Sequence, residues 1–182
     1  WATDFSEPPA GWALGSSSET VTWNFTDGKA QFSSADGTNY AGKPTGSLYT
    51  SKVTLKAGMA LSANVTVDLD PNNLLKDYAF ITLLSCSGDQ DLNQCIEALV
   101  NDSDEAESIV LWLNLDDYED DDGNPLPNGT ALDISVDLTS LAGKTGWINF
   151  GFFAVNDAEN VGAGFIVDDV VLSGPNPANT CD

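Results

Sequence analysis

Carboxylates are the only chemically reactive side chains that this sequence supplies in large, clustered numbers. The chain has 28 acidic residues against 6 lysines, with no arginine and no histidine, and its net charge is −22. Carboxylate oxygens are the ligands of hard cations such as Ca²⁺, which takes about six to eight of them. Catalysis by a histidine base or by an arginine anion clamp is excluded within this chain. The first chemistry to consider is therefore calcium binding.

The densest acidic run is "LDDYEDDDGNPLPNG", residues 115–129. It combines carboxylates, an amide and a turn, which together supply the oxygens that Ca²⁺ prefers. The run does not fit an EF-hand, because aligning Gly123 with the loop glycine puts Tyr118 at the first ligand position. A solvated acidic loop is the alternative interpretation. The candidate ligands are Asp116, Asp117, Glu119, Asp120, Asp121 and Asp122.

A second candidate is the adjacent pair Asp168 and Asp169, which interrupts the apolar stretch "FIVDDVVL". Successive side chains of a strand point to opposite faces, so one aspartate is expected to face inward or lie at the rim. A buried carboxylate needs a partner. A metal ion would serve, and so would backbone amides at a strand crossing.

Sugar binding and sugar hydrolysis are two further chemistries that carboxylates and aromatic rings support. Tyr118 lies among acids and amides, a setting typical of sugar sites, and is the candidate ligand-binding residue. The tryptophans lie among apolar neighbours and are interpreted as core. A carboxylate pair within 119–121 would serve a glycosidase, but it lies in a Gly/Asn/Pro-rich loop, so an enzyme remains a remote alternative.

Two of the three cysteines enclose the short polar segment "CSGDQDLNQC". This spacing predicts a disulfide between Cys86 and Cys95, which implies an oxidising compartment. Two free thiols are the alternative. Cys181 then has no partner within the chain and is either a spare thiol or an intermolecular link.

Strands must position these groups, because the apolar pattern has period two. Residues 60–69 alternate strictly, with Leu61, Ala63, Val65, Val67 and Leu69 on one face. Gly, Asn, Asp, Pro and Ser fill the intervening segments. The other predicted strands are 20–26, 78–85, 108–115, 131–138, 146–155 and 164–172.

Little helix is expected. Residues 91–102 suit either a short helix or an edge strand, and 137–146 suit a turn with at most one helical turn. Many short strands with turns between them predict one all-β domain, a two-sheet antiparallel jelly-roll β-sandwich with at most one or two short helices, over 1–174. Residues 175–182 are predicted to be a tail or linker.

Three stretches occur in an order typical of one group of proteins: "DFSEPPAGW", "DISVDLTSLAGKTGWINFGFFAVND" and "FIVDDVVL". In this respect the chain resembles the jelly-roll domains of cleaved adhesins and choice-of-anchor surface proteins. Those domains are related in shape to MAM domains and β-sandwich carbohydrate-binding modules. The resemblance implies that the first and last strands lie together and hold a structural Ca²⁺. Carried over, the implied ligands are Asp4, Glu7, Asp168 and Asp169, although Glu7 comes one residue late.

Together these features predict a non-enzymatic extracellular module, secreted or on a cell surface and stabilised by calcium, for adhesion or glycan binding. The alternative is a structural subunit that assembles with copies of itself into a filament or surface layer. The negative charge argues against nucleic acid as a partner, and no stretch is long and apolar enough for membrane insertion.

Overall fold

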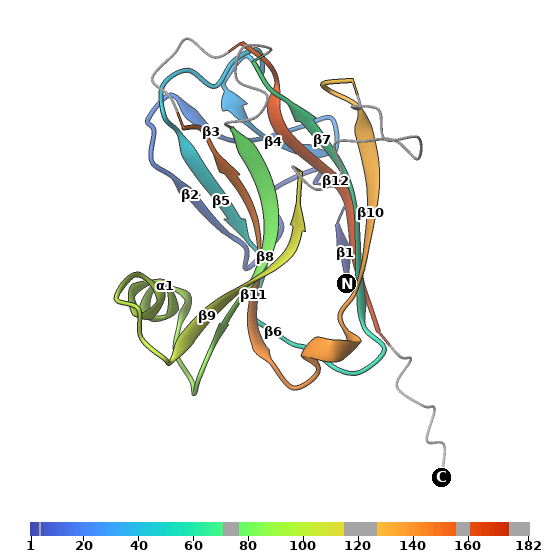
Figure 1. Cartoon of the computed structure of the whole chain (residues 1–182). Coiled ribbons are helices and arrows are strands. Elements are labelled where there is room, and N and C mark those ends of the chain that lie inside the picture. The colour runs from blue at the N-terminus through green and yellow to red at the C-terminus, as the bar shows by residue number, and fades with distance from the viewer. Residues whose placement is uncertain (4, 71–76, 115–126, 156–160, 175–182) are drawn as a thin grey trace.

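The protein folds as two antiparallel sheets packed face to face (Figure 1). The computed structural model describes residues 1–3, 5–70, 77–114, 127–155 and 161–174. Within these residues there is one α-helix and one 3₁₀ turn, and neither is long enough to span a membrane. The predicted all-β sandwich is confirmed.

The first sheet, called sheet A, has six strands. Five of them follow the order β10-β7-β12-β4-β3, and a short strand at the N-terminus, β1, pairs with β12. The first and last strands of the chain therefore lie side by side, as the resemblance implied. Their bounds are β10 (Ala131–Asp137), β7 (Ala60–Asp68), β12 (Gly164–Ser173), β4 (Lys29–Ser34), β3 (Val21–Thr26) and β1 (Ala2–Thr3).

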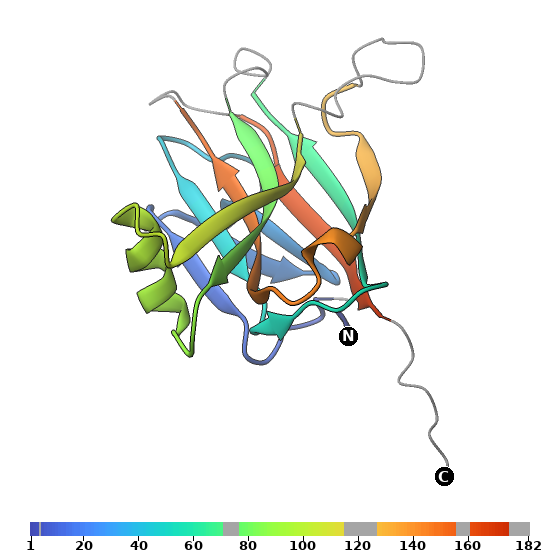
Figure 2. The ribbon, with the colours of Figure 1, turned by 60° about the horizontal axis from the view of Figure 1, so that its bottom comes forward.

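The second sheet, called sheet B, also has six strands. Its order is β2-β5-β11-β8-β9, and β6 pairs with one end of β11. The helix α1 (Leu92–Val100) lies outside sheet B and contacts β8 and β9 (Figure 2). The strand bounds are β2 (Ala13–Ser16), β5 (Thr45–Tyr49), β11 (Thr145–Phe153), β8 (Tyr78–Cys86), β9 (Ala106–Leu113) and β6 (Val53–Thr54).

The core lies between the two sheets and follows the alternation seen in the sequence. In β7 and just beyond it, the predicted inward residues from Leu61 to Leu69 are all buried, while the side chains between them are partly exposed. Aromatic rings fill the centre, with Phe32 against Phe152 at 5.7 Å between centroids. Burial of such rings is a major source of stability for a sandwich of this size.

Each strand expected from the period-two pattern is present, with ends that differ by up to two residues. The pattern did not reveal β1, β2, β4, β5 or β6, because these strands have two to six residues and each carries Ser, Thr or Gly. The open choice at 91–102 is decided as a helix. Asp91 accepts a hydrogen bond from the backbone of Gln94, and the Gln94 side chain accepts one from the backbone of Asp91, which makes a capping box. The expected helical turn is η1 (Thr139–Leu141).

One of the two aspartates in β12 was expected to face inward or to lie at the rim, and the inward position is not the one found. The register against β7 shifts between Asp168 and Val171, which is a β-bulge with one extra residue. Asp169 takes the left-handed conformation at φ 49° and is exposed. Val167 and Val170, on either side of the pair, are both fully buried. The bulge therefore keeps the apolar register intact and turns both carboxylates outward.

Candidate ligand-binding face

The outer face of sheet B carries a partly exposed group of aromatic side chains. In β8, Ala79 and Ile81 point into the core and are fully buried, so Tyr78 and Phe80 point outward. Their rings lie 6.0 Å apart between centroids. The sequence places them at alternate positions, and the strand then holds them on the same side.

The neighbouring strands complete this group. Phe153 in β11 pairs with Tyr78, and the two rings are stacked with centroids 5.3 Å apart. On the opposite side of β8, Leu113 pairs with Phe80 and Val110 pairs with Thr82. We call Tyr78, Phe80, Phe153, Val110 and Leu113 the aromatic face.

The aromatic face is accessible and slightly concave. A hollow of about 390 Å³ is lined by Tyr78, Phe80, Thr82, Val110 and Leu113. Phe153 is 38% exposed and Val110 is 62% exposed. Exposed large apolar side chains that gather in one hollow are typical of an interaction surface rather than of a random surface.

Gly151 leaves the space that the Phe80 ring occupies. A Cβ atom at position 151 would lie 2.2 Å from the Phe80 Cζ, far inside contact distance. The two residues are cross-strand partners, so the ring lies over the glycine of β11. Only a residue without a side chain permits this close approach.

Polar groups lie beside the aromatic rings. Thr82 pairs with Asn149 across β8 and β11, next to the Phe80 and Gly151 pair. The Asn149 side chain is 7% exposed, and its Oδ1 has no hydrogen-bond partner among the described residues. An apolar wall bordered by a hydroxyl and an amide can stack on a sugar ring and bond to its edge.

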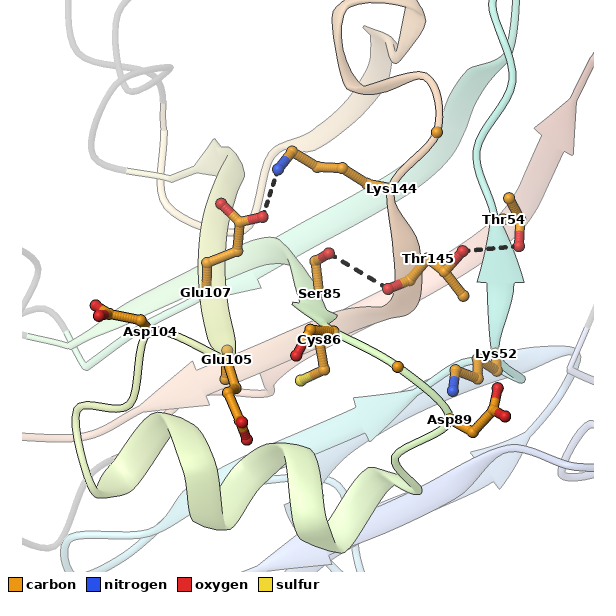
Figure 3. Close-up of a pocket in the computed structure, with 14 residues that line it drawn as sticks. Lys52, Thr54, Ser85, Cys86, Asp89, Asp104, Glu105, Glu107, Lys144 and Thr145 are labelled. Carbon is orange, nitrogen blue, oxygen red and sulfur yellow. Dashed lines mark hydrogen bonds and ion pairs between the residues drawn. The ribbon is translucent and has the colours of Figure 1, made fainter.

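A larger, polar hollow of about 800 Å³ lies at the other end of sheet B (Figure 3). Several of its charged groups already have partners. Lys144 forms an ion pair with Glu107, and Lys52 donates to the backbone oxygen of Gln90 at 2.7 Å. The Lys52 Nζ also lies 5.0 Å from the centre of the Trp147 ring. The side chains of the aromatic face carry no charges that are already neutralised by a partner. We therefore take the aromatic face as the stronger candidate for a ligand.

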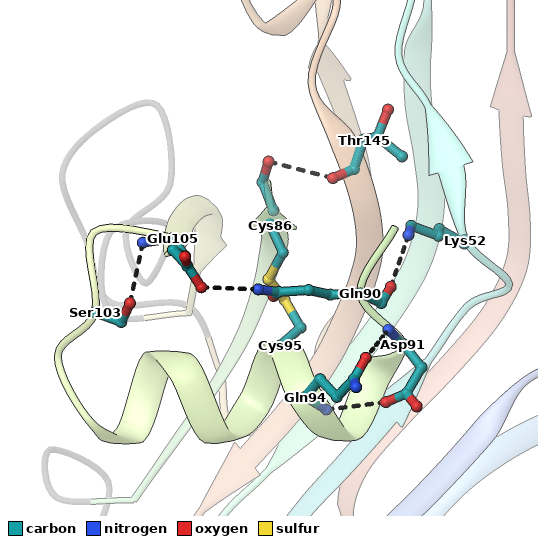
Figure 4. The surroundings of a disulfide bond; sticks show 10 residues. Lys52, Cys86, Gln90, Asp91, Gln94, Cys95, Ser103, Glu105 and Thr145 are labelled. Carbon is teal, nitrogen blue, oxygen red and sulfur yellow. Dashed lines mark hydrogen bonds between the residues drawn. A yellow bond between two sulfur atoms is a disulfide. The ribbon is translucent and has the colours of Figure 1, made fainter. Parts of the chain in front are cut away.

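Beside this hollow, Cys86 and Cys95 are joined by a disulfide (Figure 4). It ties the end of β8 to α1, and Cys95 is fully buried against Leu84 and Trp147. Around it, Gln90 donates to Glu105 at 3.1 Å. The helix thus packs at this end of β8 and β9, whereas the aromatic face lies at the other end of β8.

The predicted metal ligands that can be located do not converge. Asp168 lies 3.9 Å from the Lys29 ammonium and accepts a hydrogen bond from the Asp169 backbone. Glu7 is exposed. Within the residues that the structure describes, no group of three acidic, histidine or cysteine side chains is placed to hold a metal ion.

The remaining predicted site residues lie outside the described residues. These are the tyrosine and the acids of the dense acidic run and the aspartate of the N-terminal stretch, namely Asp4, Asp116, Asp117, Tyr118, Glu119, Asp120, Asp121 and Asp122.

The sequence pattern indicated Tyr118 as the ligand-binding aromatic residue and did not identify Tyr78, Phe80 or Phe153. A signal was present. Residues 78–84 place large apolar side chains on both faces of the strand, although an edge or outer face is usually polar. Such a strand is either covered on both sides or exposes an apolar surface.

Comparison with known proteins shows which solved structures share the fold of this chain. No protein-family model matches the chain, and no curated protein matches it. Among solved structures, the K3 cleaved adhesin domain of Lys-gingipain from Porphyromonas gingivalis W83 matches with a TM-score of 0.53 and 18% identity, over 96% of this chain and 98% of that one. The chain has the fold of a cleaved adhesin domain.

Two further structures agree with this assignment of the fold. The K1 cleaved adhesin domain of the same protein matches with a TM-score of 0.52 and 15% identity, over 96% of this chain and 98% of that one. A carbohydrate-binding module of the β-sandwich superfamily matches with a TM-score of 0.52 and 10% identity, over 94% of this chain and 60% of that one. The expected resemblance to adhesin and carbohydrate-binding jelly rolls is thereby confirmed at the level of the fold.

Proposed function

We propose that this protein is a non-enzymatic extracellular binding module whose aromatic face holds a glycan on a cell or matrix surface. The observation that carries the proposal is the set of outward-facing rings next to Thr82, in which Phe153 is exposed and Tyr78 and Phe80 are partly exposed. The shared fold with adhesin domains and a carbohydrate-binding module supports it. The disulfide agrees with an extracellular location, because such bonds persist in oxidising compartments.

The net charge limits which classes of glycan the protein can bind. At −22 the protein repels polyanions such as uronate-rich or sulfated glycans. Lysine is scarce, and no arginine exists to bind a carboxylate in two places. The ligand is therefore a neutral or amino glycan that offers an apolar ring face and hydroxyl edges.

The test is an array of neutral, amino and acidic oligosaccharides probed with the parent protein and three variants. Tyr78→Ala and Phe80→Ala each remove a ring, which should weaken binding roughly tenfold, since an aromatic contact contributes about 0.5–1.5 kcal/mol beyond its buried area. Leu14→Ala is the matched control, because Leu14 is 50% exposed on β2 of the same sheet but outside the face.

Absence of binding to every oligosaccharide would contradict the glycan proposal, and so would equal losses in all three variants. A sedimentation measurement on the same samples separates the alternative function. A self-assembling subunit would form polymers, whereas a binding module stays small. The like charge of the copies disfavours polymers at low salt.

Calcium stabilisation belongs to the same proposal. The charge of −22 makes the folded state repel itself, so a divalent cation bound by that state would add stability. The exposed carboxylates of Asp168 and Asp169 remain one candidate site, and the acidic run at 116–122 remains the other. Lys29 is the nearest cationic partner that the structure gives to Asp168.

A further inference from the structure

A buried carboxylate extends the strand pairing beneath the aromatic face. Tyr78 and Phe153 are the last paired residues of β8 and β11 at this end. Just beyond them, Asp77 Oδ1 accepts a hydrogen bond from the Val155 backbone N–H at 2.8 Å. Asp77 is fully buried. A side-chain oxygen here takes the place of the backbone acceptor that would continue the ladder.

An amide does the same on the other side of β8. Asn114 Oδ1 accepts from the Ala79 backbone N–H at 2.9 Å, and the Asn114 backbone N–H donates to the Ala79 oxygen at 3.1 Å. Asn114 is 2% exposed and follows directly on β9. The pairing of β8 with β9 is thereby continued beyond the pair formed by Phe80 and Leu113.

Asp77 is itself held in place from the core. The Tyr40 hydroxyl donates to Asp77 Oδ2 at 3.2 Å and accepts from the Asp70 backbone N–H at 2.7 Å. The Tyr40 ring is fully buried and meets Phe152 edge to face at 5.0 Å. Each carboxylate oxygen of Asp77 therefore accepts a hydrogen bond. Oδ2 accepts from the Tyr40 hydroxyl in the core, and Oδ1 accepts from the Val155 N–H just after β11.

From these contacts we infer that Asp77 and Asn114 are positioning residues for the aromatic face. Both side chains are buried, so they act through the strands and not by contact with a ligand. They fix three strands at the end where the rings lie, so that Tyr78 stays stacked on Phe153 and Leu113 stays beside Phe80. The inference rests on the proposed function for its biological meaning, but the geometric claim can be tested without any ligand.

The experiment compares ¹⁵N- and ¹³C-labelled parent protein with Asp77→Ala, Asp77→Asn and Asp70→Ala. Asp70 is the matched control: it is 4% exposed, lies in the same network and accepts from the Val161 backbone N–H at 3.1 Å. Its hydrogen bond with Val161 lies away from the Val155 N–H that Asp77 accepts from. Amide exchange and nuclear Overhauser contacts between the two stacked rings are measured at a temperature where all four proteins are folded.

Asp77→Ala should speed exchange at Val155 and Phe153 roughly tenfold or more and should remove the ring contacts, because the part-buried Val155 N–H loses its acceptor. Asp77→Asn keeps an oxygen for Val155 and should restore both signals. Asp70→Ala should speed exchange at Val161 and leave Val155 and the ring contacts unchanged. If the ring contacts survive in Asp77→Ala, or are lost equally in Asp70→Ala, the positioning role is wrong.

A second arm repeats the oligosaccharide array with the same proteins. Loss of ring order with loss of binding in Asp77→Ala alone supports both the positioning role and the proposed function. Loss of ring order with unchanged binding supports the positioning role and contradicts the aromatic face as the binding site. Asn114→Ala extends the test to β9, with faster exchange expected at Ala79 and reduced affinity.

Discussion

At the scale of single residues, the Tyr40 hydroxyl stabilises the fold through two buried hydrogen bonds. Burial raises the pKa of Tyr40 above its usual value, and the negative charges of Asp77 and Asp70 act in the same direction, against the hydrogen bond from the Asp70 backbone. The folded state thus binds this proton more tightly than the unfolded state. Its contribution is complete below the unfolded pKa, about 10, and is lost as the pH rises toward the folded pKa.

The variant Tyr40→Phe tests this. It should lower the free energy of unfolding by about 1–3 kcal/mol at neutral pH, because the Asp77 carboxylate and the Asp70 N–H lose a partner. Above pH 10 the stability of the parent should fall more steeply than that of the variant. Denaturant unfolding at pH 7 to 11 measures both effects, and parallel curves would contradict the raised pKa.

Also at the scale of residues, Asp169 marks the bulge that turns two carboxylates outward. Its left-handed conformation is one that glycine adopts freely and β-branched residues adopt only with strain. Asp169→Gly should leave the melting temperature unchanged or raise it slightly, whereas Asp169→Val should cost about 1–2 kcal/mol. A larger loss for Gly than for Val in thermal unfolding would contradict the bulge.

At the scale of elements, α1 depends on its disulfide. The helix has nine residues and is too short to be stable alone. The loop closed by Cys86 and Cys95 should contribute about 2–3 kcal/mol through the unfolded state. Replacing both cysteines by Ala should therefore loosen α1 and expose Trp147, which is 6% exposed in the intact fold.

Tryptophan emission reports that change as a shift to longer wavelength. The shift should vanish in a background with Trp147→Phe, which isolates this ring from the other four tryptophans. Peptide mass spectrometry without reduction should find the two cysteines linked in protein from its native compartment. Free thiols at both positions would refute the predicted bond.

At the scale of the whole molecule, charge repulsion should make stability depend on cations. Ca²⁺ at a hundredfold excess over its Kd should add about 2.7 kcal/mol, or roughly 5–10 °C in Tm. Mg²⁺ should add less, because it gives up its water reluctantly. Asp168→Asn with Asp169→Asn is compared with Asp116→Asn and Asp117→Asn, which make the same change in charge.

The double variant that loses the stabilisation by calcium identifies which pair of aspartates contributes ligands. If a chelator changes the melting temperature of the parent and both double variants equally, neither pair contributes ligands. Sodium chloride at matched ionic strength is the control for screening alone.

The sequence by itself determined the chemistry and the class of fold. The absence of histidine and arginine excludes catalysis by a histidine base or by an arginine anion clamp within this chain, whatever the fold. Period-two alternation, as in 60–69, is a local property of the backbone, so it identifies strands and their buried faces before any partner is known. The capping box at Asp91 is local as well, although its competition with a strand could not be decided without the disulfide and the contacts of the helix with β8 and β9.

Only the tertiary structure decided which surface is available for binding. Tyr78 and Phe153 are 75 positions apart in the chain, and they stack because β8 pairs with β11 in one register. The bulge after Asp168 reversed the expected direction of a carboxylate, and α1 covered Trp147 while leaving Phe80 open. Strand order, register shifts and cover by a distant element arise from contacts between segments far apart in sequence, so the alternation within one strand carries no information about them.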